Sequence, residues 1–211
     1  YRIQWYANIR ADCFKPDFLS EDMISRMKQL GCCRLGMGVE SGSQRVLDEI
    51  IKKDIKLEYV FEAARLCSKY DIMVGYSFMM GLPGETKSDI LKTLSLMKKI
   101  KQLHHKCFFF GPQVYRPFPG SELYKQAVRV GFNDPEDLEG WAKIEHSKSL
   151  QGKLSGEYSW SGFDPSDFPW VKQAGLIRHI DFLQHFLFRD LKSMKIDLKY
   201  PIKVMLVLIA R

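Results

Sequence analysis

The sequence lacks the cysteine spacings on which local metal sites depend. Its five cysteines stand at positions 13, 32, 33, 67 and 107, and none of them forms C-x-x-C or C-x-x-x-C-x-x-C. Zinc loops and iron–sulfur cluster loops use such spacings. The thiols therefore predict no metal ligands in this chain, and they fit a reduced, cytoplasmic protein.

Long hydrophobic runs and blocks of like charge are also missing. The stretch "VMLVLIA" (204–210) has seven apolar residues, whereas a membrane helix needs about 20, so no membrane span is expected. The formal net charge is +7, but the basic residues are scattered without a long cationic block. Nucleic acid is therefore not the favoured partner.

What the sequence does contain is a regular alternation of strand-like and helix-like segments. Mostly apolar stretches begin near residues 3, 33, 72 and 107, at spacings of 30, 39 and 35 residues. Capping signals mark helices between them: Ser20 precedes 21–30, and Thr86 is followed three residues later by Asp89. This pattern predicts an α/β fold with a parallel sheet, either part of a TIM-type (β/α)₈ barrel or a doubly wound sheet.

The alternation weakens after residue 131. Residues 155–170 are rich in turn formers and aromatic residues, and a helix with a broad apolar face is expected at about 169–194. The pattern therefore divides the chain into a core over 1–131 and an accessory, α-helical and irregular section over 132–211. The strand-like pattern at the first residue, without an initiating Met, indicates a piece of a longer protein.

Polar residues and glycines stand at the four strand ends, where a parallel α/β sheet binds its ligands. Each group also has a purely structural interpretation as a rim ion pair, a helix N-cap or a tight turn. The adjacent histidines 104 and 105 fit a solvated loop better than a metal site. In chain order, the groups are Arg10 and Asp12; Glu40, Ser41 and Ser43; Gly81, Gly84 and Glu85; and Gln113, Tyr115 and Arg116.

Four motifs occur in order along the core: "WYANIRAD" (5–12), "GVESGS" (38–43), "FMMGLPGET" (78–86) and "YRPFPGSELY" (115–124). Together they resemble the radical S-adenosylmethionine (SAM) superfamily. The likeness is greatest to its cobalamin-binding branch, which contains the anaerobic magnesium-protoporphyrin IX monomethyl ester cyclase. It covers about residues 1–131, the second half of that family's barrel core.

The resemblance implies an enzyme that binds SAM and a [4Fe–4S] cluster and acts through a 5′-deoxyadenosyl radical. Cobalamin is a further cofactor of the branch, and the implied substrate is a small organic or tetrapyrrole-like molecule. The resemblance assigns Glu40 and Ser41 to the ribose or amino-acid part of SAM, and Arg10 to a place near the SAM carboxylate or the substrate.

The later motifs are assigned to adenine. Met79 and Gly81 match a strand whose apolar side chain and backbone pack on the base, and Gln113 to Tyr115 match a second adenine-facing segment. These roles are expectations that come from the resemblance alone.

The chain departs from the family because it lacks the C-x-x-x-C-x-x-C cluster loop, the earlier strands and a cobalamin domain. We therefore expect the cluster ligands to lie in a missing N-terminal part of the same protein, and this fragment to be inactive alone. Two alternatives stay open: a tRNA-modifying, methylthiotransferase-like enzyme, and a non-catalytic half-barrel binding module. The binding module predicts that Glu40 is locked in a rim salt bridge that closes the cavity.

Overall fold

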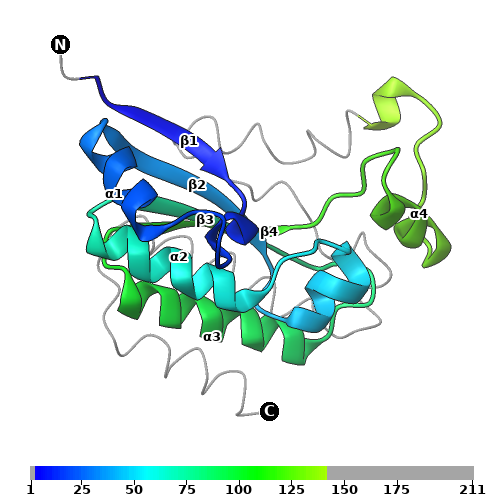
Figure 1. Ribbon diagram of the computed structural model, residues 1–211. Coiled ribbons are helices and arrows are strands. Elements are labelled where there is room, and N and C mark those ends of the chain that lie inside the picture. Colours follow the sequence, from blue (N-terminus) through cyan, green and yellow to red (C-terminus); the bar gives the residue numbers. More distant parts are fainter. Residues whose placement is uncertain (1–2, 142–211) are drawn as a thin grey trace, which may run out of the picture.

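A computed structural model describes residues 3–141, in which four strands form one parallel sheet in the order β1-β2-β3-β4 (Figure 1). The strands are β1 (Trp5–Ile9), β2 (Cys32–Glu40), β3 (Met73–Met80) and β4 (Cys107–Val114). The helices are α1 (Glu21–Gln29), α2 (Leu57–Lys69), α3 (Lys87–Leu103) and α4 (Glu122–Arg129), with a 3₁₀ turn at Ala11–Phe14 and a π-helical turn at Val46–Ile51.

This arrangement confirms the predicted fold class: parallel strands alternate with helices, as in part of a TIM-type barrel. The division at residue 131 stays a prediction, because most of the accessory section lies outside the described residues. The helix expected at about 169–194 lies outside them as well.

Side-chain caps explain where three helices begin. The Ser20 hydroxyl accepts a hydrogen bond from the Met23 amide at the start of α1, and Ser121 caps α4 in the same way. Thr86 and Asp89 form a reciprocal capping box at the start of α3. Each cap satisfies amide groups that have no partner within the helix.

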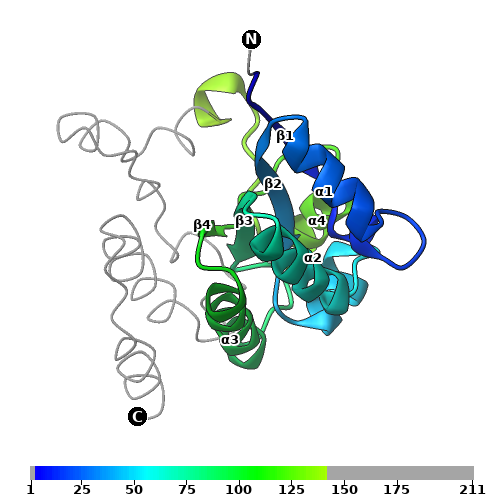
Figure 2. The same ribbon diagram turned by 60° about the vertical axis from the view of Figure 1, so that its left-hand side comes forward.

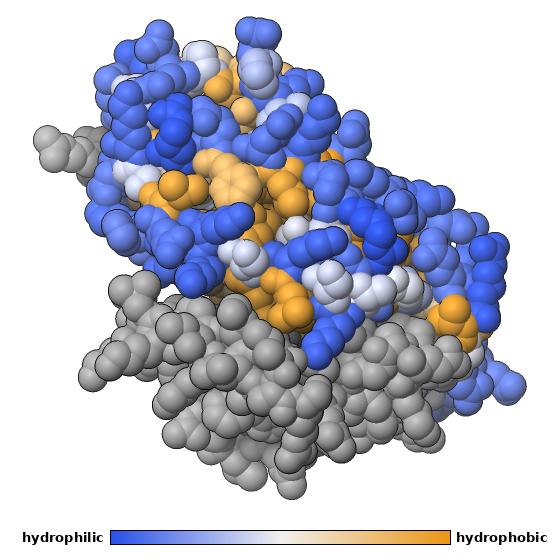
Figure 3. All heavy atoms as spheres, turned by 90° about the horizontal axis from the view of Figure 1, so that it is seen from below, coloured by the Kyte–Doolittle hydropathy of each residue, from blue (hydrophilic) through white to orange (hydrophobic). Residues whose placement is uncertain are grey.

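The three helices α1, α2 and α3 lie together on one face of the sheet (Figures 1 and 2). Alternate residues of each strand point toward this layer; in β2 these are Leu35, Met37 and Val39, all at most 2% exposed. Helix α2 contributes the apolar face around Val60 and Ala64, which are fully buried. Hydrophobic side chains show between the hydrophilic surface residues where the molecule is seen from below (Figure 3).

On the other face of the sheet, β2 and β3 carry residues with very small side chains or none. We call it the glycine-rich face. Strand register places its residues in two rows: Asn8, Gly36, Gly75 and Phe108 in the first, and Gly38, Ser77 and Phe110 in the second.

A smaller apolar cluster lies at the carboxyl ends of the strands. Met80, Leu82 and Tyr115 pack there with residues of α4, which lies beyond the sheet in Figure 1. This cluster anchors the exits of β3 and β4, two of the segments that the sequence assigns to ligand binding.

Candidate functional site

A hollow of about 380 Å³ opens on the glycine-rich face. Asn8, Arg10 and Ser77 supply polar groups to its lining, and Phe110 supplies an aromatic one. Small-molecule sites commonly enclose about 300–1,000 Å³ and combine a few polar groups with apolar walls. The hollow is therefore of a size and chemistry suited to a nucleoside-sized ligand.

The absence of side chains on the glycines makes room for their neighbours. A Cβ added to Gly75 would lie 2.6 Å from Cζ of Phe108 and 2.9 Å from Cε2 of Phe110, so both rings lie over this glycine. A Cβ added to Gly36 would lie 2.3 Å from Oδ1 of Asn8. The floor of the hollow thus depends on bare backbone in β2 and β3.

Arg10 stands at the rim of the hollow, directly after β1. Asp12 holds its guanidinium through two hydrogen bonds, Nε to Oδ1 at 2.9 Å and Nη2 to Oδ2 at 3.1 Å. These hydrogen bonds hold the pKa of the Asp12 carboxyl below its usual value. Arg10 is therefore both an ion-pair partner and a lining residue, and its role toward a ligand stays a prediction.

Glu40 occupies an unusual position at the end of β2. Its φ of +71° lies in the left-handed region, and the register of β2 against β3 shifts between Gly38 and Glu40. A non-glycine residue in this region costs about 1–3 kcal/mol, and such strain occurs often at functional sites. The carboxylate turns back over Gly38, because a Cβ added there would lie 2.5 Å from Glu40 Oε1.

Lys53 is the ion-pair partner of Glu40. Its Nζ donates to Glu40 Oε1 at 2.8 Å and to the Gly38 carbonyl oxygen at 2.9 Å. The salt bridge expected of a binding module is therefore present. It does not close the cavity, because the hollow beside Gly38 remains.

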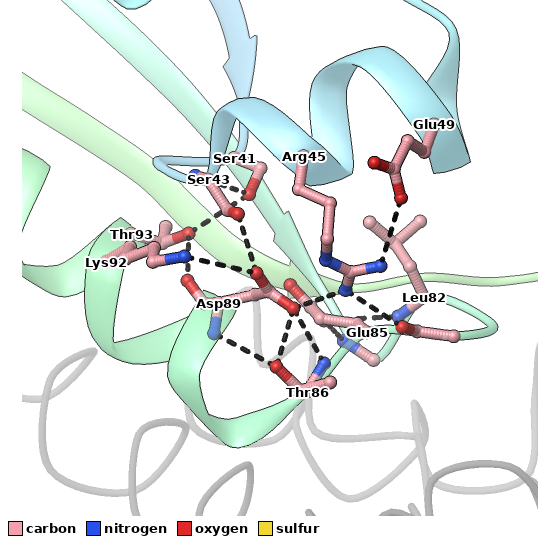
Figure 4. A network of polar contacts seen from close by, with 12 residues as sticks. Ser41, Ser43, Arg45, Glu49, Leu82, Glu85, Thr86, Asp89, Lys92 and Thr93 are labelled. Atoms are coloured by element: carbon pink, nitrogen blue, oxygen red, sulfur yellow. Dashed lines mark hydrogen bonds and ion pairs between the residues drawn. The ribbon is translucent and has the colours of Figure 1, made fainter.

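Ser41 lies behind the sheet end rather than on its glycine-rich face. It is fully buried, its hydroxyl accepts a hydrogen bond from the Ser43 amide at 3.1 Å, and Thr93 Oγ1 lies 3.3 Å from it (Figure 4). Thr93 also accepts a hydrogen bond from the Gly42 amide at 2.8 Å. Ser41 thus fixes the turn against α3.

Asp89 is the centre of the polar network in Figure 4. Its carboxylate accepts hydrogen bonds from the Ser43 hydroxyl at 2.6 Å, the Thr86 amide at 3.0 Å and the Arg45 guanidinium. Burial opposes ionisation, but hydrogen bonds, first from Arg45 and then from Ser43 and Thr86, outweigh it and hold the pKa of Asp89 well below its usual range. Asp89 is therefore a buried anion that ties the exit of β2 to the exit of β3.

The buried side chain of Glu85 stabilises the turn that follows β3. Its Oε2 accepts hydrogen bonds from the Gly81 amide at 2.6 Å and the Leu82 amide at 3.3 Å. Burial raises the pKa of this carboxyl to about 7, and the two amides offset the effect of burial only in part. Gly81 adopts a φ of +73°, which a glycine tolerates at no steric cost.

The remaining predicted residues belong to β3, β4 and the segment after β4. Met79 and Gln113 are register partners, so the structure brings together the two segments assigned to adenine. Tyr115 donates its amide to the Met80 carbonyl oxygen at 2.8 Å, and its ring is buried in the smaller apolar cluster. Of the seven predicted ligand-binding residues, Arg10 lines the hollow and the other six do not.

Sequence reasoning missed three residues that line the hollow and the lysine that pairs with Glu40. Asn8 and Ser77 are polar residues at alternate positions of apolar strands, and this two-residue period was the available signal. Phe110 follows the same period in β4. Lys53 gave no local signal, because its contact depends on the turn that follows the π-helical segment.

SAM fits the residues that are present. The hollow offers a guanidinium for a carboxylate and amide and hydroxyl groups for a ribose, beside an aromatic wall. An iron–sulfur cluster does not fit residues 3–141, which contain no group of three His, Cys, Asp or Glu side chains able to hold a metal ion. In the same part of the chain, no helix is both long and apolar enough to cross a bilayer.

The parallel sheet with helices on one face defines an α/β protein, and comparison with known proteins shows which family part of it resembles. Residues 6–97 match the family model described as the Radical SAM superfamily. This part of the chain is therefore similar to part of a radical SAM domain. It contains β1 to β3 and most of α3, including the glycines of the hollow.

Two curated relatives illustrate the range of similar proteins. The chain is 29% identical over 126 residues to an uncharacterized methyltransferase of Pyrococcus horikoshii, covering 60% of this chain and 25% of the relative. It is 27% identical over 163 residues to the tRNA-2-methylthio-N(6)-dimethylallyladenosine synthase of a Thermoanaerobacter species, covering 74% of this chain and 32% of the relative. The chain thus spans about a quarter to a third of the length of these relatives.

A solved structure is similar at lower coverage. The cobalamin-dependent S-adenosylmethionine radical enzyme OxsB aligns with a TM-score of 0.40 and 24% identity, over 44% of this chain and 14% of that chain.

Proposed function

We propose that residues 3–141 form the SAM-binding part of a radical SAM enzyme of the cobalamin-binding branch. The observation that carries this proposal is the hollow on the glycine-rich face, where Arg10, Asn8 and Ser77 gather within the segment that matches the superfamily. In this proposal the cluster ligands and the cobalamin site belong to a part of the protein outside the described residues. Without those ligands, residues 3–141 bind SAM but do not turn over.

Residues that line the hollow or lie near it then have roles toward SAM. Arg10, held by Asp12, binds the carboxylate of the methionyl part. Asn8 and Ser77 donate hydrogen bonds to the ribose hydroxyls and accept them, and the Glu40 carboxylate accepts hydrogen bonds from the ribose hydroxyls or the amino group. Met79, Gly81, Gln113 and Tyr115 shape the adenine end, and Ser41 acts by fixing the turn beside Glu40. Bound SAM supplies the radical chemistry that defines the superfamily.

The substrate in this proposal is a small organic or tetrapyrrole-like molecule. A second candidate is RNA, because the relative that covers 74% of this chain is a tRNA-2-methylthio-N(6)-dimethylallyladenosine synthase. The basic residues are scattered along the sequence without a long cationic block, so the charge pattern does not support this candidate. A non-catalytic binding module is favoured only by the Glu40–Lys53 ion pair.

The proposal is tested with the 211-residue chain and S-adenosylhomocysteine, a stable analogue, by isothermal titration calorimetry. We expect saturable binding with one site per chain, weaker binding of adenosine, and weaker binding still of methionine. Absence of saturable binding at millimolar analogue would overturn the proposal. Binding of a tRNA transcript at physiological salt would instead support the RNA candidate.

A matched pair of substitutions locates the site. Ser77→Leu places a bulky side chain in the hollow, and we expect it to weaken analogue binding at least tenfold. Ser95→Leu makes the same chemical change at an exposed position of α3 and should leave binding unchanged. Equal affinity of the two variants would place the ligand elsewhere.

A further inference from the structure

The ammonium group of Lys53 bridges two acceptors on one strand. It donates to the carbonyl oxygen of Gly38, which is part of β2, and to the side chain of Glu40, two residues further on. The two contacts fix both the position and the direction of the Glu40 carboxylate. An exposed, single-contact ion pair would leave a side chain of this length free to rotate.

The local backbone delivers both side chains to this point. The left-handed φ of Glu40 and the register shift turn its carboxylate back over the sheet. Lys52 ends the π-helical turn with a φ of +54°, and the following amide of Lys53 donates to the Leu47 carbonyl oxygen at 2.8 Å. A left-handed residue in the contact, Glu40, and another beside it, Lys52, therefore place the two side chains together, which indicates that the contact matters beyond local packing.

Gly38 is the residue that admits the pair onto the glycine-rich face. A Cβ there would lie 2.5 Å from Glu40 Oε1 and 3.0 Å from Lys53 Nζ. Gly38 also lines the hollow. The side chains of Glu40 and Lys53 are 18% and 20% exposed, so solvent competes little for their charges.

We propose that Lys53 is a positioning residue that holds the Glu40 carboxylate over Gly38, at the edge of the ligand hollow. Lys53 engages Oε1, so Oε2 is the oxygen that accepts a hydrogen bond from a ligand hydroxyl or ammonium group. This inference rests on the proposed SAM site, and it makes the ion pair a component of that site rather than a block to it.

The test is a double-mutant cycle on binding of S-adenosylhomocysteine to the 211-residue chain. Lys53→Met keeps the stem of the side chain and removes the ammonium group, and Glu40→Gln removes the charge of its partner. We expect each single variant to bind about tenfold more weakly. The double variant should bind no more weakly than either single variant, because Lys53 acts through Glu40.

Conservative rescue separates positioning from a general loss of structure. Lys53→Arg keeps a cationic donor and should bind within about threefold of the wild type. Lys98→Met makes the control change at an exposed site on α3. Multiplicative losses in the double variant, or wild-type affinity in Lys53→Met, would overturn the role of Lys53.

A crystal structure of the Lys53→Met variant without ligand gives a readout that does not depend on the proposed function. We expect the Glu40 carboxylate to leave its place over Gly38. A carboxylate that stays there overturns the inference even if the analogue binds. If the carboxylate moves but the wild type binds no analogue, Lys53 positions Glu40 and the SAM proposal fails.

Discussion

The hydroxyl of Ser43 donates to the carboxylate of Asp89 at 2.6 Å, although the two residues belong to the exits of different strands. Ser43 follows β2, and Asp89 lies in the first turn of α3, which follows β3. The same carboxylate accepts from Arg45, the residue that begins the π-helical turn. The separation of the two strand exits is therefore set by a buried charge rather than by apolar packing alone.

Replacing Asp89 by Asn tests this role. The amide keeps one acceptor but turns an NH₂ group toward donors and removes the buried anionic partner of Arg45, so we expect a loss of about 2–3 kcal/mol of unfolding free energy at pH 7. Urea denaturation measures it. Because the folded pKa of Asp89 is lowered, its stabilisation is present above its unfolded pKa and fades as the pH falls below about 4.

The control for Asp89→Asn is Asp22→Asn. Asp22 also lies in the first turn of a helix, but it is exposed. We expect this variant to stay within about 0.5 kcal/mol of the wild type. A similar loss in both variants would assign the effect to the helix dipole instead of the network.

Close packing of the turn after β2 predicts that Gly42→Ala destabilises the fold more than Gly36→Ala does. A Cβ on Gly42 would lie 2.5 Å from the Thr93 Cα and 2.6 Å from the Lys92 carbonyl oxygen, which are backbone atoms and cannot rotate away. Gly42→Ala should therefore cost about 2 kcal/mol or more. Gly36→Ala should cost less, because the atom it meets is the side-chain oxygen of Asn8. Denaturation of both variants checks the order, and the reverse order contradicts it.

The fold could be predicted from the sequence because its signals are local. Apolar stretches at βα spacing gave the parallel sheet, and Ser20, Thr86 and Asp89 gave the caps that the structure contains. The π-helical form of Val46–Ile51 is a feature that a helix-like apolar period does not distinguish from an α-helix.

The site was predictable only in part, because the direction of a side chain depends on the chain around it. Arg10 follows a strand directly, and the structure places it at the hollow. Lys53 reaches Glu40 through a left-handed turn and a register shift, and no sequence pattern encodes both. The solvated loop expected for histidines 104 and 105 is wrong for His104, which is 1% exposed because it packs at the end of α3.

We expect the free energy of unfolding to depend on pH in the neutral range because of Glu85. Its pKa is raised from 4.5 to about 7 by burial. The folded state therefore holds a proton that the unfolded chain releases, and the contribution of Glu85 to stability falls as the pH rises from about 4.5 to 7. Glu85→Gln keeps a carbonyl oxygen for the Gly81 and Leu82 amides and does not titrate.

We expect the unfolding free energy of Glu85→Gln, relative to the wild type, to rise by up to about 3 kcal/mol between pH 4.5 and pH 8. Urea denaturation at the two pH values measures the change. Glu58→Gln, at an exposed position in the first turn of α2, is the control and should show no such trend. A constant difference for Glu85→Gln would show that its carboxyl is ionised across this range.

His104 should have the opposite effect on the free energy of unfolding at acidic pH. Burial, reinforced by the nearby charge of Lys101, lowers its pKa from 6.5 to about 4. Between pH 6.5 and 4, His104 is therefore protonated in the unfolded chain but not in the folded state. The free energy of unfolding falls by up to about 3 kcal/mol as the pH drops through this range. His104→Phe removes the titrating group and should flatten this part of the profile. His105→Phe changes the exposed neighbour, and the dependence of the unfolding free energy on pH should stay as steep as in the wild type. Equal slopes in the two variants would mean that His104 is protonated within the fold.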